Sequence, residues 1–212
     1  MLYSQNPNMK KQLIPSQVKG SKLDVTAQTS FGTREGAAAF FEYVKKRLSN
    51  VDNWAKLCGT EATTFELLNR DGTGRGRFEV GDLIKIDIPG PGSGVGNGYD
   101  WVEIEIIESG SDAKGQYFGF MVRPTNNPER PLDGVAHFFD KSASSSFIAR
   151  LSGYTVTAEM HGRNEEPNSS EPGFFDSIRN IAVGYGAKVG LSYPQWKLLV
   201  EGLVRNEDKM GI

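Results

Sequence analysis

Between residues 62 and 163 the sequence repeatedly alternates apolar and polar residues with a period of two. Ile84, Ile86 and Ile88 share one side of such a segment, and charged residues stand between them. This is the period of a β-strand, because successive side chains point to opposite faces of a sheet. The stretch therefore predicts an antiparallel sheet, and it restricts the fold more than any other part of the chain.

Further strands are expected within this stretch and just before it. Val102, Ile104 and Ile106 repeat the alternation, and a glycine-rich segment, residues 89–98, separates them from the isoleucine strand. The two strands are thus predicted to form a hairpin with a long tip. We expect the remaining strands at residues 24–31, 65–68, 116–123, 134–139, 145–151 and 154–161, with Ser152 and Gly153 as a two-residue turn between the last two.

Apolar residues with a helical period flank the sheet region on both sides. Thr33 is the expected N-cap of a first helix, whose buried face is Ala37, Phe40, Phe41, Val44 and Leu48. A shorter helix is expected at residues 50–58. Near the C-terminus, residues 174–185 predict one helix, and a final helix is expected to begin at Ser192, with Gln195 completing a capping box.

This order of elements predicts an α+β fold: a single antiparallel, curved β-sheet of six or seven strands, packed with an N-terminal helix pair and C-terminal helices. The order resembles the helix-grip architecture of START-like lipid-binding domains, which implies a curved sheet wrapped around a long C-terminal helix over a cavity. A small β-barrel flanked by helices is the alternative. Residues 1–22, with four lysines and no acid, are expected to be a loose N-terminal arm, and residues 23–212 a single α+β domain.

Composition narrows the classes of partner. The 212 residues carry a net charge of −2, which favours neither nucleic acid nor an anionic membrane surface. No stretch approaches the ~20 apolar residues needed to span a bilayer, so membrane insertion is not expected and a cytoplasmic location is. The single cysteine, Cys58, excludes an internal disulfide and is expected to be a buried apolar residue.

Metal-ligand chemistry is the first possibility for a site. Glu159 and His161 project from the same side of the strand at residues 154–161, and His137 lies on another expected strand. Two imidazoles and a carboxylate can bind zinc or non-haem iron if the strands bring them together. The alternative is the solvated face of an antiparallel sheet. Because the spacing of a metal motif is absent, no metal or other cofactor is predicted.

A dense polar segment follows this strand. His161, Arg163, Asn164, Glu165 and Asn168 lie close together in sequence, and Arg179 is on the next expected helix. Arginine beside amides can bind a carboxylate or phosphate in a bidentate manner. Alternatively, these groups pair among themselves and fix the loop in place. We expect a carboxylate, that of Glu165 or Asp176, to anchor Arg163.

These observations favour a non-catalytic binding protein with a concave sheet or pocket. The segment from His161 to Asn168 and the glycine-rich tips would form its rim, and the ligand would be a small apolar molecule or a protein partner. The tips at residues 71–77 and 89–98 lead into strands, not helices, so they are not predicted to bind phosphate. The alternatives are a metal-dependent hydrolase-type enzyme centred on His137, Glu159 and His161, and a structural subunit of a larger assembly. The sequence does not predict an oligomeric state.

Overall fold

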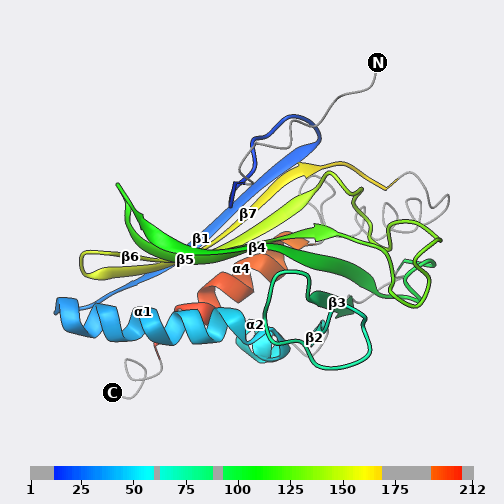
Figure 1. Ribbon diagram of the computed structural model, residues 1–212. Helices are drawn as coiled ribbons and strands as arrows, with labels where there is room; N and C mark the ends of the chain where they lie inside the picture. The colour runs from blue at the N-terminus through cyan, green and yellow to red at the C-terminus, as the bar shows by residue number, and fades with distance from the viewer. Residues whose placement is uncertain (1–11, 60–62, 88–92, 169–191, 207–212) are drawn as a thin grey trace.

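The computed structural model describes residues 12–59, 63–87, 93–168 and 192–206 (Figure 1). Seven strands form one antiparallel sheet in the order β1-β7-β6-β5-β4-β3-β2. Their bounds are β1 Ser21–Ser30, β2 Thr64–Leu68, β3 Leu83–Asp87, β4 Asp100–Asp112, β5 Gly115–Pro124, β6 Ser144–Ser152 and β7 Thr155–Glu165. Because β1 returns to pair with β7, the first strand and the last lie side by side.

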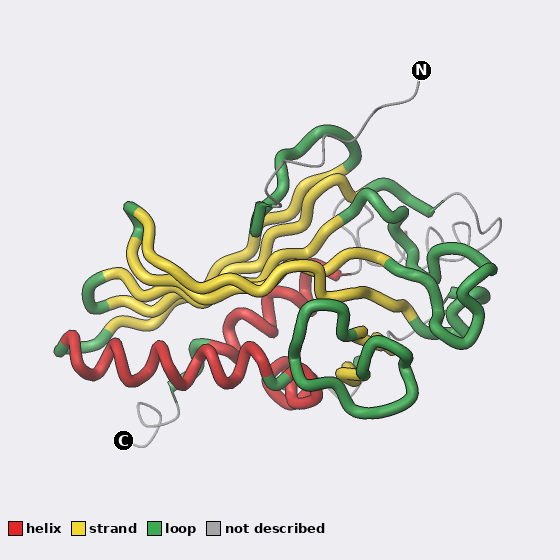
Figure 2. The backbone as a smooth tube through the Cα atoms, in the orientation of Figure 1, coloured by secondary structure: helices red, strands yellow, loops and turns green. Residues whose placement is uncertain are grey.

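The helices lie on one side of this sheet (Figure 2). They are α1 (Arg34–Ser49), the short 3-10 turn η1 (Val51–Asn53), α2 (Trp54–Cys58) and α4 (Ser192–Leu203). The hydroxyl of Thr33 accepts a hydrogen bond from the Gly36 amide at 3.0 Å and caps α1 as predicted. All five predicted apolar residues of α1 are buried. None of the described helices is long and apolar enough to cross a membrane.

The face of the sheet that meets the helices is filled by aromatic side chains. Trp54 of α2 packs against Phe147 of β6 with ring centroids 4.9 Å apart, and Phe147 in turn packs against Phe120 at 5.2 Å and Trp196 at 5.3 Å. On β7, Val156, Ala158 and Met160 belong to the same cluster and are fully buried. The two-residue period of β7 was therefore interpreted correctly, and its polar residues point to the opposite side, which we call the outer face.

The predicted fold class is confirmed: the protein is an α+β, helix-grip-like fold built on one curved antiparallel sheet. The sheet is open, with β1 and β2 at its two edges. The barrel alternative is therefore wrong, because closing a barrel requires the two edge strands to pair.

Three sequence predictions differ from the structure or fall outside it. Residues 134–139 are not a strand: Val135 and Phe139 form only isolated bridges, and the backbone leaves Gly134 at a φ of 96°. Ser152 pairs with Thr155, so Gly153 and the residue after it form the hairpin turn. The helix expected at residues 174–185 lies outside the described residues.

The prediction of a loose N-terminal arm at residues 1–22 also needs correction for part of this segment. β1 already begins at Ser21, and the segment before it lies on the outer face, opposite the helices (Figure 1). The Ser146 hydroxyl donates a hydrogen bond to the Leu13 carbonyl at 2.6 Å, and backbone atoms of residues 16–19 bond to Asn164. A loose arm therefore does not describe residues 13–22. The division into an arm and a single domain stays a prediction.

Candidate functional site

His161 stands in a row of charged side chains on the outer face. Its Nδ1 lies 2.6 Å from Oδ1 of Asp24 on β1, and its Nε2 lies 3.0 Å from Oε2 of Glu159. Each ring nitrogen of His161 thus lies within hydrogen-bond distance of a carboxylate oxygen. The row continues through Arg150, whose Nε is 2.9 Å from Glu159 and whose NH1 is 2.9 Å from Asp112.

The predicted carboxylate partner of Arg163 exists, but it is a different residue. NH2 of Arg163 lies 2.7 Å from Oδ1 of Asp24, and NH1 donates to the carbonyls of Leu23 and Gly162 at 3.1 and 2.7 Å. Glu165 is therefore not the partner, and Asp176 lies outside the described residues. Sequence reasoning missed Asp24 because the contact depends on the pairing of β1 with β7, which joins residues far apart in the chain.

The charges of this row shift the ionisation of its acids. Desolvation by itself would raise the pKa of Asp24, but hydrogen bonds from His161, Arg163 and Lys22 outweigh it and lower the pKa to about 2. Desolvation opposes ionisation at Glu159 too, and hydrogen bonds from His161 and Arg150 again prevail and lower its pKa. Glu165 lacks such cationic hydrogen-bond donors, and burial raises its pKa. The acids of the row are thus held ionised by their partners.

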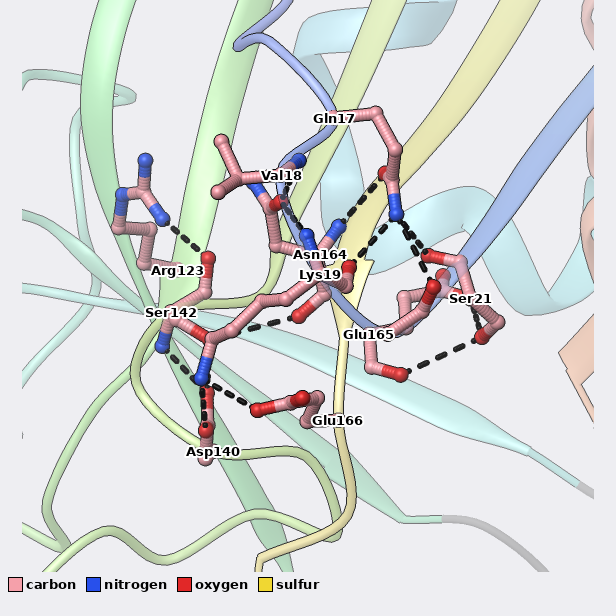
Figure 3. Close-up of polar contacts among 11 residues, drawn as sticks. Gln17, Val18, Lys19, Ser21, Arg123, Asp140, Ser142, Asn164, Glu165 and Glu166 are labelled. Atoms are coloured by element: carbon pink, nitrogen blue, oxygen red, sulfur yellow. Dashed lines mark hydrogen bonds and ion pairs between the residues drawn. The ribbon is translucent and has the colours of Figure 1, made fainter.

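Asn164 and Asn168 hold segments of the chain together (Figure 3 draws Asn164). The Asn164 side chain bonds to backbone atoms of the N-terminal segment, and Asn164 itself has a φ of 55°. The Asn168 amide donates to the carbonyls of Val135 and His137 at 2.9 and 3.0 Å. We call this whole set the β7 network: Asp24, Arg150, Glu159, His161, Arg163, Asn164 and Asn168, with the residues 135–138 to which Asn168 bonds. Arg179 lies outside the described residues.

The second histidine does not join the first. His137 is buried in the segment between β5 and β6, where its Nδ1 accepts a hydrogen bond from the Phe139 amide at 2.9 Å and its ring stacks on Phe138. Burial lowers its pKa to about 3. In the described part of the chain no group of three His, Cys, Asp or Glu side chains is arranged to hold a metal ion. The structure thus gives no support to a metal centre of His137, Glu159 and His161.

Cys58 matches its predicted role as a buried apolar residue. It lies in the core beneath α4, and desolvation raises the pKa of its thiol to about 11. A thiol in this state is a poor nucleophile, because only the thiolate reacts. Both histidines and the single cysteine of the chain are therefore held in buried or fully paired positions.

The described residues form a cleft at the other end of the sheet. It has a volume of about 640 Å³ and lies over the outer face of β2 and β3, with walls from the loops at residues 72–75, 96–99 and 127–129. Gly72, at a φ of 72°, lets two of these loops meet, since a Cβ there would stand 2.4 Å from the Pro128 ring. Trp101 closes the floor, with its indole donating to the Gly96 carbonyl at 3.4 Å. Three loops that are distant in sequence therefore form one concave surface.

Lys85 places a partly buried ammonium group in this cleft. Its side chain is 26% exposed, and its Nζ lies 4.0 Å from the ring centroid of Tyr99 and 3.6 Å from Oε2 of Glu66. An ammonium carries three donors, and a separation of 3.6 Å is too long for a hydrogen bond. Among the described contacts, then, this half-buried ammonium has no hydrogen-bond acceptor, and it faces the cleft.

The rim of the cleft carries charges of both signs. Arg75, whose side chain is 77% exposed, pairs with Asp52 at 3.0 Å, and Asn97 lies 3.5 Å from Glu129. Such exposed pairs contribute little to stability and rearrange at little cost. A polar ligand would thus meet donors and acceptors on the rim and one cation on the floor.

Sequence reasoning did not find this cleft. The glycine-rich tips at residues 71–77 and 89–98 were expected at a binding rim, and parts of both do line it, but neither Lys85 nor Tyr99 was singled out. One signal was available: Lys85 stands between two isoleucines on a predicted strand. The convergence of three loops has no signature in the sequence.

Comparison with known proteins gives similarities to solved structures only. No protein-family model and no curated protein matches the chain. Norcoclaurine synthase from Thalictrum flavum aligns over 100% of this chain and 99% of its own, with 9% identity and a TM-score of 0.41. Ara h 8.0201 aligns over 88% and 100%, with 12% identity and a TM-score of 0.37. The major latex-like protein 151 of Panax ginseng aligns over 75% and 91%, with 14% identity and a TM-score of 0.33. At such values these likenesses assign no ligand or activity to this chain.

Proposed function

We propose that this protein is a non-catalytic binding protein, and that the cleft over β2 and β3 binds a small molecule with an anionic group of carboxylate size. The observation that carries the proposal is the ammonium of Lys85, half-buried on the cleft floor with no hydrogen-bond acceptor among the described residues. A partly desolvated cation stabilises an anion that can accept its hydrogen bonds. The ligand would accept the hydrogen bonds of the Lys85 ammonium that Glu66, at 3.6 Å, is too distant to accept.

The surroundings of Lys85 support a ligand that is polar. Thr73 and Asn97 bring a hydroxyl and an amide to the walls, and Glu129 adds an acceptor on the rim. The sequence favoured a small apolar ligand on the concave sheet, but the helix side of the sheet is filled by the cluster around Trp54 and Phe147. The cleft on the outer face brings Lys85 and other polar groups to its lining, so the proposed ligand carries a polar, anionic group.

The state of the histidines and of the cysteine supports binding without catalysis. His161 has a carboxylate on each ring nitrogen, His137 is buried with its pKa lowered to about 3, and Cys58 is a buried thiol. A general base must reach the substrate with a free lone pair near its operating pH. None of these three groups lines the cleft.

An NMR titration with sodium benzoate tests the proposal, with neutral benzamide as the matched ligand control. We expect benzoate to shift the amide signals of residues 66, 85, 97 and 99 with a dissociation constant of about 1 mM, a usual affinity for a fragment of this size. In Lys85→Met, which keeps the aliphatic stem, benzoate affinity should fall at least about tenfold. Lys46→Met, at an exposed position on α1, is the matched control and should bind like wild type.

Two results would overturn this assignment. One is that benzamide shifts the same signals as strongly as benzoate does. The other is that Lys85→Met binds benzoate as well as wild type. Either result would show that the cleft does not recognise an anion through Lys85.

A further inference from the structure

The N-terminal segment is bound at its backbone by the side chain of one residue. Oδ1 of Asn164 accepts hydrogen bonds from the amides of Val18 and Lys19 at 2.7 and 3.2 Å, and its Nδ2 donates to the Ser16 carbonyl at 3.1 Å (Figure 3). The backbone amide of Asn164 also donates a hydrogen bond to Oε1 of Gln17 at 3.0 Å. A carboxamide that both accepts from and donates to the backbone recognises a peptide without regard to most of its side chains.

A second anchor lies at the other end of the segment. The Leu13 carbonyl accepts a hydrogen bond from the Ser146 hydroxyl at 2.6 Å, and the Leu13 side chain lies over Gly119 of β5. A Cβ at Gly119 would stand 3.1 Å from Cδ2 of Leu13, so the glycine leaves room for the leucine. Met121 and Ile148, the outer-face neighbours of this point, are only 1% exposed, although the outer face of such a sheet usually meets water.

The third anchor is ionic. Nζ of Lys19 lies 3.0 Å from Oδ2 of Asp140 and also contacts Oε2 of Glu166. Asp140 is held in place by Ser142, whose backbone amide donates to it at 2.6 Å. The groove thus offers three contacts. β5 and β6 provide an apolar surface for Leu13, Asn164 binds the backbone, and Asp140 and Glu166 provide carboxylates for Lys19.

We propose that this part of the outer face is a peptide-binding groove, which the chain's own N-terminal segment fills. The groove would accept, from another molecule, a peptide with an apolar residue six positions before a lysine. Most of the hydrogen bonds go to backbone atoms that any peptide possesses. The side chains of the lysine, of the glutamine two positions before it and of the apolar residue provide the selectivity. Since the resident segment is tethered, its effective concentration is in the millimolar range, and a peptide in trans must compete with it.

The groove is tested with the full-length chain in which residues 12–19 are replaced by glycine and serine. The probe is a synthetic peptide of residues 12–20, followed by fluorescence polarisation. We expect it to bind this variant at least about tenfold more tightly than wild type, whose groove is filled. A peptide with glutamate in place of Lys19 should bind at least about tenfold more weakly, because it meets Asp140 and Glu166.

Asn164→Gly provides the decisive comparison. Glycine tolerates the φ of 55° at this position, so the substitution removes the clamp without straining the backbone. In the glycine–serine background it should abolish peptide binding. Asn97→Gly, at a φ of 56° on the rim of the distant cleft, is the matched control and should leave peptide binding unchanged. Equal peptide affinity with and without the Asn164 side chain, or no peptide binding by the glycine–serine chain, would overturn the proposal.

Hydrogen exchange of the wild-type protein keeps the test valid even if the glycine–serine chain does not fold. The amides of Val18 and Lys19 should exchange at least about tenfold more slowly than in the free peptide, and Asn164→Gly should remove this protection while the amides of β6 keep theirs. Exchange of the two amides at the rate of the free peptide in wild type would show that the groove does not hold the segment, and would overturn the proposal.

Discussion

The charged side chains of the β7 network and those of the Lys85 cleft lie on the same outer face of the sheet, over different strands, and they differ in how closely opposite charges are paired. In the network, Arg150, His161 and Arg163 each meet a carboxylate at 3.0 Å or less. In the cleft, the carboxylate closest to Lys85 is 3.6 Å away. Polar groups that are buried and paired hold segments of the chain together, whereas a half-buried group with unused donors can serve a ligand.

The two regions should therefore respond in opposite ways to the loss of a cation. Removing one partner of a buried pair leaves the other desolvated and unsatisfied, and this costs more than the pair itself contributes. Removing a cation that has no hydrogen bond leaves nothing unsatisfied. Stability measurements separate the two cases, and binding measurements should show the reverse order.

The largest effect is expected from pH at the end of the network, where Asn168 holds the segment with His137. The pKa of His137 is lowered to about 3 in the folded protein, so between pH 6.5 and 3 the unfolded chain binds a proton that the folded protein does not. The free energy of unfolding should then fall with decreasing pH, by about 1.4 kcal/mol per unit below pH 6 and by up to about 5 kcal/mol in all. Urea unfolding at pH 7, 6 and 5 measures this slope.

His137→Asn is the matched variant for this slope. The Oδ1 of asparagine can accept the Phe139 amide as Nδ1 of His137 does, but it does not titrate. The variant should lose some stability at every pH because the smaller side chain packs less well, and its slope between pH 6 and 5 should be flatter than that of wild type. The same slope in both proteins would show that the lowered pKa of His137 does not cause the pH dependence of stability.

The second effect concerns Arg163. Arg163→Met removes the contacts to Asp24 and to the carbonyls of Leu23 and Gly162 but keeps an apolar stem, and we expect it to lower the free energy of unfolding by about 2–3 kcal/mol. Lys22→Met is the control: Lys22 also pairs with Asp24, at 3.0 Å, but it is 53% exposed, so its loss should cost no more than about 0.5 kcal/mol. Denaturant melts of both variants give the comparison. Equal losses would contradict a special role for buried pairing.

The sequence predicted the local structure well and the long-range contacts poorly. The period of α1 and the alternation of β7 depend on neighbouring residues, and the structure confirms both patterns, although β7 continues to Glu165, four residues beyond the predicted end of the strand. The pairing of β1 with β7 joins Asp24 to His161, and no local pattern encodes that register. Polar side chains of the segment from His161 to Asn168 make contacts within the chain, as the alternative considered for it supposed, and their role in binding stays a prediction.

The segment at residues 134–139 is a second example of long-range contacts that the local sequence pattern does not predict. Its apolar residues satisfied the strand pattern, but their backbone partners come from several places: Ala136 bonds to Thr125, and Phe138 accepts from Asn168. A pattern of apolar residues reports burial and does not report which groups satisfy the backbone. For the same reason the Lys85 cleft escaped prediction, since it exists only where three loops meet.

The smallest effect on stability is expected in the cleft. Lys85→Met removes an ammonium that has no hydrogen bond among the described contacts, and the methionine stem can still pack against Tyr99. Losing the 3.6 Å contact with Glu66, which is 57% exposed, and the contact with the Tyr99 ring should cost at most about 1 kcal/mol. The melt of this variant should therefore lie close to that of Lys22→Met, well above that of Arg163→Met. A loss as large as that of Arg163→Met would mean that Lys85 is structural, and the contrast between the two regions would then fail.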